Sequence, residues 1–196
     1  MQTISGSIEQ WPEGTEEEKQ EIKDLVNKSC PIQNTKLSFI KMEEEAGWTR
    51  ITVKFNDGEF LIKYSSYMFD ASVLSQFVAK IIDIKEEIVL FLDYEGSWPL
   101  LYINPIDDDV RFLFAHDYNL FLNDDYDIDE YTIRDYTIEC DTVVNKKELL
   151  KNFYDILYPF TINYDIIAAQ KGHYDDVFNI ENGKKYLSKI KAYLEK

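Results

Sequence analysis

The chain has 196 residues, a formal net charge of −16 and 45% hydrophobic residues. This composition is typical of a globular domain and argues against intrinsic disorder, and no apolar run is long enough for a membrane-spanning helix. The negative charge disfavours nucleic-acid binding, because an acidic surface repels phosphate. Since the N-terminus carries no secretory signal pattern, the sequence predicts a soluble, cytoplasmic protein.

The first third of the chain predicts an arm, a helix and three strands. Residues 1–14 contain two glycines and a proline and are expected to form a flexible N-terminal arm, followed by a single domain over 15–196. Thr15 and Glu18 match a capping box, so a short helix should begin there. Short apolar segments, partly alternating with polar residues, then predict strands at 35–43, 49–56 and 59–64.

An amphipathic helix is predicted at 71–83, because its apolar residues recur at spacings of three and four. Three apolar runs follow at 88–92, 100–103 and 110–115 with almost nothing between them. Runs this short, rich in Val, Ile and Phe and bounded by Gly, Pro and Asp, indicate strands. Their short connections permit only antiparallel neighbours. Because the runs are nearly continuous, we expect these strands to be central or covered on both faces.

The last third predicts one more strand and two or three helices. Alternation changes parity within 131–140, which indicates a strand with a bulge near Arg134. Asn145 should start a helix that Pro159 kinks or ends. A final amphipathic helix is expected after Gly183.

These elements together predict an α+β fold: a largely antiparallel sheet of about seven strands packed by amphipathic helices. The order of three strands followed by a helix occurs twice. Two βββα halves are therefore a possible description of the fold.

No sequence motif fixes a chemistry. The seven glycines are scattered, so no phosphate-binding loop is present. Cys30 and Cys140 are expected to be free, buried thiols. His116, followed by Asp117, fits an oriented general base, but a strand-end histidine with a local partner is the preferred interpretation. His173 is interpreted as a polar loop residue, and two histidines are too few to suggest a histidine metal site. We therefore predict no catalytic residue, no metal and no cofactor.

Acidic residues are concentrated between Asp107 and Asp141, where twelve of them stand against two arginines. In one interpretation they are solvated loops and strand faces that discourage edge-to-edge aggregation. In the other, an acidic, tyrosine-bearing surface meets a basic protein partner, with carboxylates guiding the encounter and aromatics supplying contact area. The candidate partner-binding residues are Asp107, Asp108, Asp109, Asp117, Asp124, Asp125, Tyr126, Asp127, Asp129 and Tyr131.

Three functional hypotheses follow. The first is a non-catalytic bacterial protein that binds another protein, for example an immunity-type inhibitor that covers the phosphate-binding surface of a basic toxin. It predicts a basic protein partner and neither nucleic acid nor membrane. The second is a hydrolase or metal-dependent enzyme with a motif-free carboxylate site. The third is a structural or oligomeric component that uses an exposed sheet edge. The sequence leaves the oligomeric state open.

Overall fold

The computed structural model describes residues 2–5, 16–33, 35–45, 47–65, 71–92, 99–117, 136–171 and 180–196. In this part of the chain, eight strands and four α-helices confirm the predicted α+β class. The elements in chain order are β1 (Gln2–Ser5), α1 (Glu16–Lys28), β2 (Leu37–Glu45), β3 (Trp48–Phe55), β4 (Gly58–Ser65), α2 (Ala71–Lys80), the 3-10 helix η1 (Ile81–Asp83), β5 (Ile88–Phe91), β6 (Leu100–Ile106), β7 (Asp109–Asp117), β8 (Tyr136–Asn145), α3 (Lys146–Lys171) and α4 (Ile180–Leu194).

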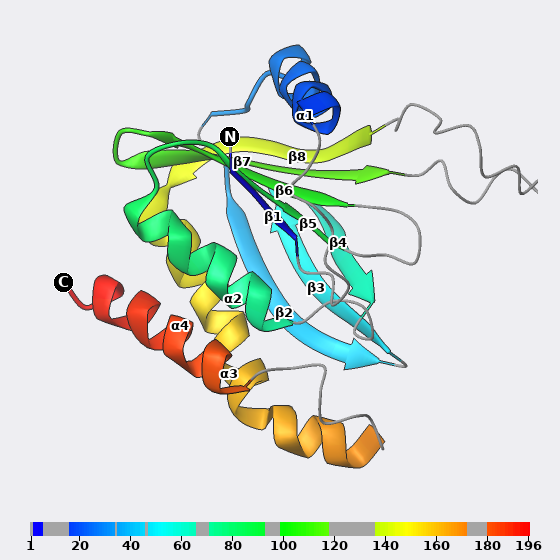
Figure 1. Cartoon of the computed structure of the whole chain (residues 1–196), viewed down its shortest axis with the longest axis vertical. Helices are drawn as coiled ribbons and strands as arrows, with labels where there is room; N and C mark the ends of the chain where they lie inside the picture. Colours follow the sequence, from blue (N-terminus) through cyan, green and yellow to red (C-terminus); the bar gives the residue numbers. More distant parts are fainter. Residues whose placement is uncertain are drawn as a thin grey trace, which may run out of the picture.

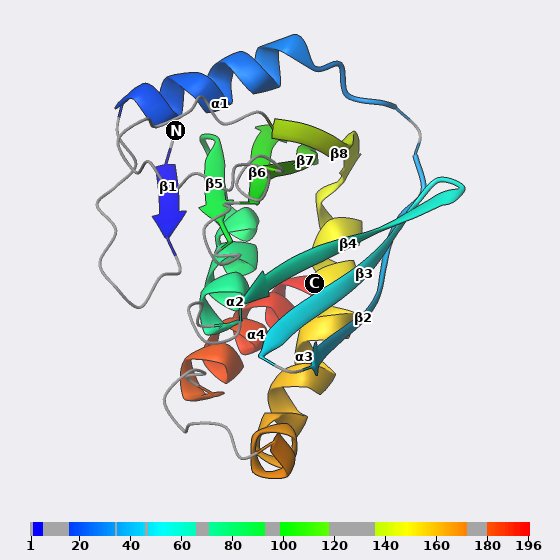
Figure 2. The same cartoon turned by 90° about the vertical axis from the view of Figure 1, so that its right-hand side faces the viewer.

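The larger of two sheets has five strands in the order β1-β5-β6-β7-β8. Strands β5, β6 and β7 pair antiparallel in sequence order, as their short connections predict, and β8 pairs antiparallel with β7. The turn between β6 and β7 lies at Asp107 and Asp108, where Ile106 pairs with Asp109. Strand β1 joins the β5 edge in parallel, with Gln2 opposite Ile88 (Figure 2).

The smaller sheet has three antiparallel strands in the order β2-β3-β4. Its β3–β4 turn contains Asn56, whose φ is 53°. A register shift between Phe39 and Lys41 leaves Ile40 as an extra residue in β2. The sequence predicts about seven strands in one sheet, whereas the structure divides its strands between two sheets.

The elements are arranged in layers on the two faces of the five-stranded sheet (Figure 1). Helix α1 lies on one face, which we call the outer face of the large sheet. The three-stranded sheet, α2 and α3 lie on the inner face, and α4 packs against α2 and α3. Both faces of the large sheet are therefore covered, as the nearly continuous apolar runs of β5, β6 and β7 predict.

Aromatic side chains connect the two sheets and α3 in the main core. Phe39 of β2 lies edge-on to Phe112 of β7, with ring centroids 6.0 Å apart, and contacts Phe153 of α3 at 4.3 Å. Phe60 of β4 stacks on Phe114 of β7 at 5.5 Å. These buried contacts hold the smaller sheet against the larger one.

A second, smaller core lies under α1. Ile22 and Val26 of the helix are buried against apolar side chains on the outer face of the large sheet. The buried sheet residues of this cluster are Val89, Leu100, Tyr102, Leu113 and Ala115. One face of α1 therefore packs on the large sheet through Ile22 and Val26.

The structure differs from the predicted arm at residues 2–5, which form β1 rather than a flexible segment; residues 1 and 6–14 lie outside the described residues. The edge of β5 would otherwise present unpaired backbone groups. Thr3 and Ile4 are β-branched and suit a strand, so this short segment can pair with the edge.

Three sequence predictions for the C-terminal half have different outcomes. The predicted bulge near Arg134 lies outside the described residues, and β8 carries an extra residue at Glu139. Helix α3 continues past Pro159 to Lys171, so the proline does not end it. Helix α4 begins at Ile180, so Gly183 lies in its first turn, where backbone N–H groups lack intrahelical partners anyway.

Both cysteines are free, as predicted, but only one is buried. Cys140 is buried in β8, whereas Cys30 is exposed just beyond the end of α1.

Candidate functional site

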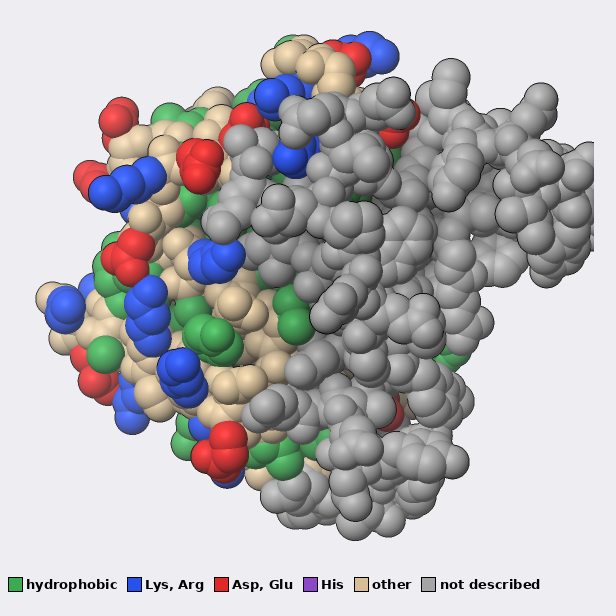
Figure 3. Space-filling view, in the orientation of Figure 1, with side chains coloured by type: hydrophobic (Ala, Val, Ile, Leu, Met, Phe, Trp, Pro, Cys, Tyr) green, Lys and Arg blue, Asp and Glu red, His purple; other side chains and the backbone are tan. Residues whose placement is uncertain are grey.

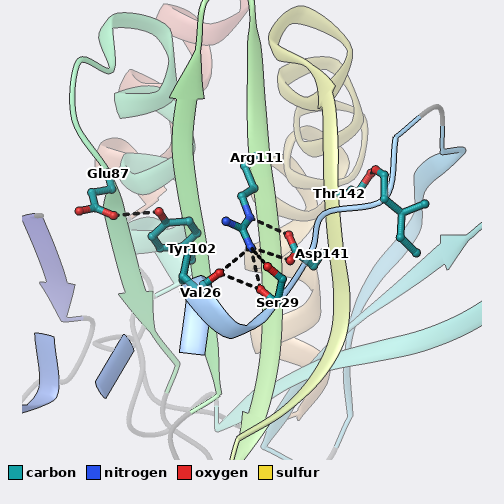
Figure 4. Close-up of polar contacts among 8 residues, drawn as sticks. Val26, Ser29, Glu87, Tyr102, Arg111, Asp141 and Thr142 are labelled. Carbon is teal, nitrogen blue, oxygen red and sulfur yellow. Dashed lines mark hydrogen bonds and ion pairs between the residues drawn. The ribbon is translucent and has the colours of Figure 1, made fainter. Parts of the chain in front are cut away.

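A polar cluster lies between the end of α1 and the outer face of the large sheet (Figure 4). Its centre is Arg111, on β7. The Nη2 atom of Arg111 donates to the carbonyl oxygen of Val26 at 2.9 Å and to the hydroxyl oxygen of Ser29 at 2.7 Å. Positive charge beside the last carbonyls of a helix is stabilising. Arg111 therefore holds the C-terminal end of α1 on the sheet.

Arg111 also forms a bidentate ion pair with Asp141 of β8. Its side chain is 13% exposed and that of Asp141 only 6%. The hydrogen bonds to Asp141 raise the pKa of Arg111, and they outweigh burial, which lowers it. Both charges are thus neutralised within the sheet, where an unpaired charge would be costly.

Tyr102 of β6 lies in the same cluster. Its hydroxyl donates to Glu87 Oε2 at 2.8 Å. Burial raises the pKa of Tyr102, and the hydrogen bond to Glu87 raises it further. A hydroxyl that keeps its proton near neutral pH is a poor base, so this pair acts as a structural hydrogen bond.

The segment after α1 attaches to the edge of β8 at Ile32. The backbone N–H of Ile32 donates to the Asp141 carbonyl at 3.0 Å, and the N–H of Val143 donates to the Ile32 carbonyl at 3.3 Å. The hydroxyl of Thr142 also donates to the Ile32 carbonyl, and it contacts the hydroxyl of Thr35. Together with the bonds of Arg111, these contacts join three segments of chain: α1 with the residues after it, β7 and β8. We call this group the clamp; it consists of Val26, Ser29, Ile32, Arg111, Asp141 and Thr142.

The acidic candidates of the β6–β7 turn lie at one end of β7. Asp107 and Asp108 are exposed. Asp109 accepts a hydrogen bond from Asn145 at 3.3 Å, and the backbone N–H of Lys146 donates to the Asp108 carbonyl at 3.3 Å. This turn therefore adjoins the start of α3 at Asn145 and Lys146.

Asp117 lies at the opposite end of β7 from Asp109. Eight residue steps of strand separate these two by roughly 26 Å. The remaining candidates lie outside the described residues; they are Asp124, Asp125, Tyr126, Asp127, Asp129 and Tyr131. Asp141, the last acidic residue of this stretch, is buried in the clamp and is not part of a surface. The structure thus brings Asp107, Asp108 and Asp109 together but separates them from Asp117.

Basic side chains are concentrated elsewhere. Lysines gather on the face formed by α2 and α4 (Figure 3). Lys189 of α4 pairs with Asp83 at 2.8 Å, and the charges of Lys146 and Lys196 also act on this carboxylate. The end of the molecule near the start of α3 therefore carries charges of both signs.

Of the two histidines, His116 lies among the described residues, at the end of β7. His116 is half-buried, with Nε2 3.4 Å from the Leu61 carbonyl oxygen and its ring edge-on to Phe114. His173 lies outside the described residues. In the parts of the chain that the structure describes, no group of three or more His, Cys, Asp or Glu residues could hold a metal ion.

Sequence reasoning missed Arg111 as an organising residue. The available signal was a single arginine between Val110 and Phe112 in an otherwise apolar strand. A charge in such a position requires a buried partner.

Comparison of the chain with models of protein families, with curated proteins and with solved structures found no match. Among the described residues, no helix combines the length and apolar character that a membrane crossing requires.

Proposed function

We propose that this is a non-catalytic protein that acts by binding a basic protein, as an immunity-type inhibitor of a bacterial toxin would. The observation that carries this proposal is the concentration of acidic residues between Asp107 and Asp141 in a chain of net charge −16. An acidic surface attracts a basic partner over long distances and accelerates their encounter. A nuclease-like toxin, whose substrate surface is basic, is one class of partner that this charge would suit.

The two ends of β7 are unequal candidates for the centre of this surface. At the β6–β7 turn, Asp107 and Asp108 adjoin the start of α3, whose first two residues are Lys146 and Lys147. Beyond Asp117, the sequence continues with Asp124, Asp125, Asp127, Asp129 and Glu130 before the first basic residue, Arg134. We therefore place the main partner contact after Asp117 and assign the turn a secondary role.

Three double variants with equal changes in charge test this assignment. Asp125→Asn with Asp127→Asn removes charge from the main candidate stretch, and Asp107→Asn with Asp108→Asn removes it from the turn. The control is Asp57→Asn with Glu59→Gln at the exposed β3–β4 turn. Each protein is immobilised and exposed to lysate of its source cells at low and high salt, and retained proteins are identified by mass spectrometry.

We expect the unaltered protein and the control to retain the same basic protein at low salt and to release it at high salt. The Asp125/Asp127 variant should lose it, and the Asp107/Asp108 variant should retain less of it than the control. The association rate of the purified partner should fall in the same order. A lack of any salt-sensitive basic partner, or equal retention by all three variants, would refute the proposal.

A further inference from the structure

Helix α1 and the two residues after it, Glu16–Cys30, form what we call the α1 strap. The strap contacts the rest of the protein with few apolar groups. Of its described side chains, Ile22 and Val26 are buried and Leu25 packs at the margin. The main core, by contrast, buries side chains from both sheets and from α2, α3 and α4. Local stability follows the number of buried apolar contacts, so the strap is the less stable layer.

The polar contacts of the strap are also arranged so that they can break without stranding a charge. Arg111 donates to Val26 and Ser29 of the strap, but its charge is neutralised by Asp141, which belongs to the sheet. If the strap moves away, this ion pair stays intact and gains water. Because a desolvated ion pair is a weak source of stability, its hydration offsets part of the contacts that are lost.

A fixed point lies directly after the strap. Ile32 is bound to β8 through backbone bonds to Asp141 and Val143 and through the Thr142 hydroxyl. Pro31 stands between this anchor and the strap; its ring fixes φ, and it has no backbone N–H whose hydrogen bond would have to break. The chain can therefore bend at Ser29 and Cys30 while β8 keeps its edge contact.

From this geometry we propose that the α1 strap opens as one unit from the folded sheets, with Arg111 as its latch. Opening turns the helix about the link at Ser29 and Cys30 and uncovers the apolar outer face of the large sheet, including Leu100 and Leu113. Both sheets, α2, α3 and α4 stay folded because their main core does not include the strap.

Hydrogen exchange of the full chain, measured across low concentrations of denaturant, tests the proposal. Amides of Val26 to Ser29 should exchange through an opening that depends weakly on denaturant, because it exposes little surface. Amides of β6 and β7 should exchange only through global unfolding. The same free energy and denaturant dependence for both groups would overturn the proposal.

Arg111→Lys tests the latch, since lysine keeps the charge but lacks the planar fork. Exchange in α1 should accelerate about tenfold, the effect expected for the loss of about one charged hydrogen bond. Exchange in β6 and β7 should accelerate at least as much, because global unfolding breaks the same bonds and also the Arg111–Asp141 pair. The control Arg50→Lys alters an exposed pair on β3 and should leave α1 exchange unchanged. Unchanged α1 exchange in Arg111→Lys would contradict a latch. If that variant does not fold, the exchange pattern of the unaltered protein decides.

Discussion

Arg111 and Asp141 face each other from adjacent strands, with Nε 2.9 Å from Oδ1 and Nη2 2.8 Å from Oδ2. We predict that Asp141→Asn lowers the free energy of unfolding by about 3 kcal/mol, because it leaves the arginine charge largely buried and unpaired. Urea denaturation at neutral pH measures the change. Glu45→Gln, which alters an exposed pair with Arg50, is the control and should cost less than about 1 kcal/mol. Similar losses for both variants would contradict this account of the clamp.

Because the pKa of Tyr102 is raised in the folded protein, we predict a loss of stability at alkaline pH. Burial first, and then the hydrogen bond to Glu87, raise the pKa of Tyr102 above its ordinary value of 10.0. Its contribution is therefore complete below that pH and is lost as pH rises, because the unfolded chain releases the proton more readily than the native protein. Urea midpoints measured from about pH 9 to about pH 11 should fall less in Tyr102→Phe than in the unaltered protein. The exposed Tyr158→Phe serves as the control and should fall as the unaltered protein does.

Because the pKa of Asp83 is lowered in the folded protein, we predict a loss of stability at acidic pH. The hydrogen bond from Lys189 is the largest cause that lowers the pKa of Asp83 below 3.8, and the charges of Lys189, Lys146 and Lys196 add to it. The contribution is present above pH 3.8 and is lost as pH falls through the lowered native value. Because the pair is exposed, we expect less than about 1 kcal/mol.

NMR titration of the Asp83 carboxyl group provides the more sensitive measurement. Lys189→Ala should move its pKa up towards 3.8. Lys191→Ala, which removes a lysine whose partner is Glu195 at 3.8 Å, should leave it nearly unchanged. An unchanged Asp83 titration in Lys189→Ala would show that the pair does not form in solution.

The β6–β7 turn predicts opposite effects of two substitutions at one position. Asp107 has a φ of 52°, a left-handed conformation that glycine adopts without strain. Asp107→Gly should therefore leave stability unchanged or raise it by a few tenths of a kcal/mol, whereas Asp107→Val should lower it by about 1–2 kcal/mol. Thermal unfolding measures both. Asp108→Val is the control for side-chain size and should change stability by about 0.5 kcal/mol or less; equal effects of valine at both positions would contradict a special role for this conformation.

Local patterns were sufficient to predict most of the elements. The spacing of apolar residues predicted α2, and the short runs bounded by Gly, Pro and Asp predicted the antiparallel order of β5, β6 and β7. Strand β1 could not be predicted in the same way, because its four residues become a strand only by pairing with Ile88–Phe91, far away in the sequence. The division into two sheets was also out of reach. Alternation shows that one face of β3 is buried, but it does not show which layer covers that face.

The clamp illustrates why the polar contacts were harder to predict than the elements. Arg111 is conspicuous within its strand, yet Asp141 and Ser29 come from segments that only the folded chain brings together. The charge pattern, in turn, suggested a common acidic surface from Asp107 to Asp141. The direction of β7 separates Asp109 from Asp117, and the register of β8 turns Asp141 towards Arg111.

The parallel pairing of β1 with β5 has a consequence for how this protein is made on the ribosome. Gln2–Ser5 leave the exit tunnel before Ile88–Phe91 are synthesised, so β1 cannot pair until β5 is complete. Ile32 likewise cannot contact Thr142 until β8 has been synthesised. During translation, Gln2–Ser5 and Ile32 therefore remain without these partners while β2, β3 and β4, which form a sheet of their own, can assemble.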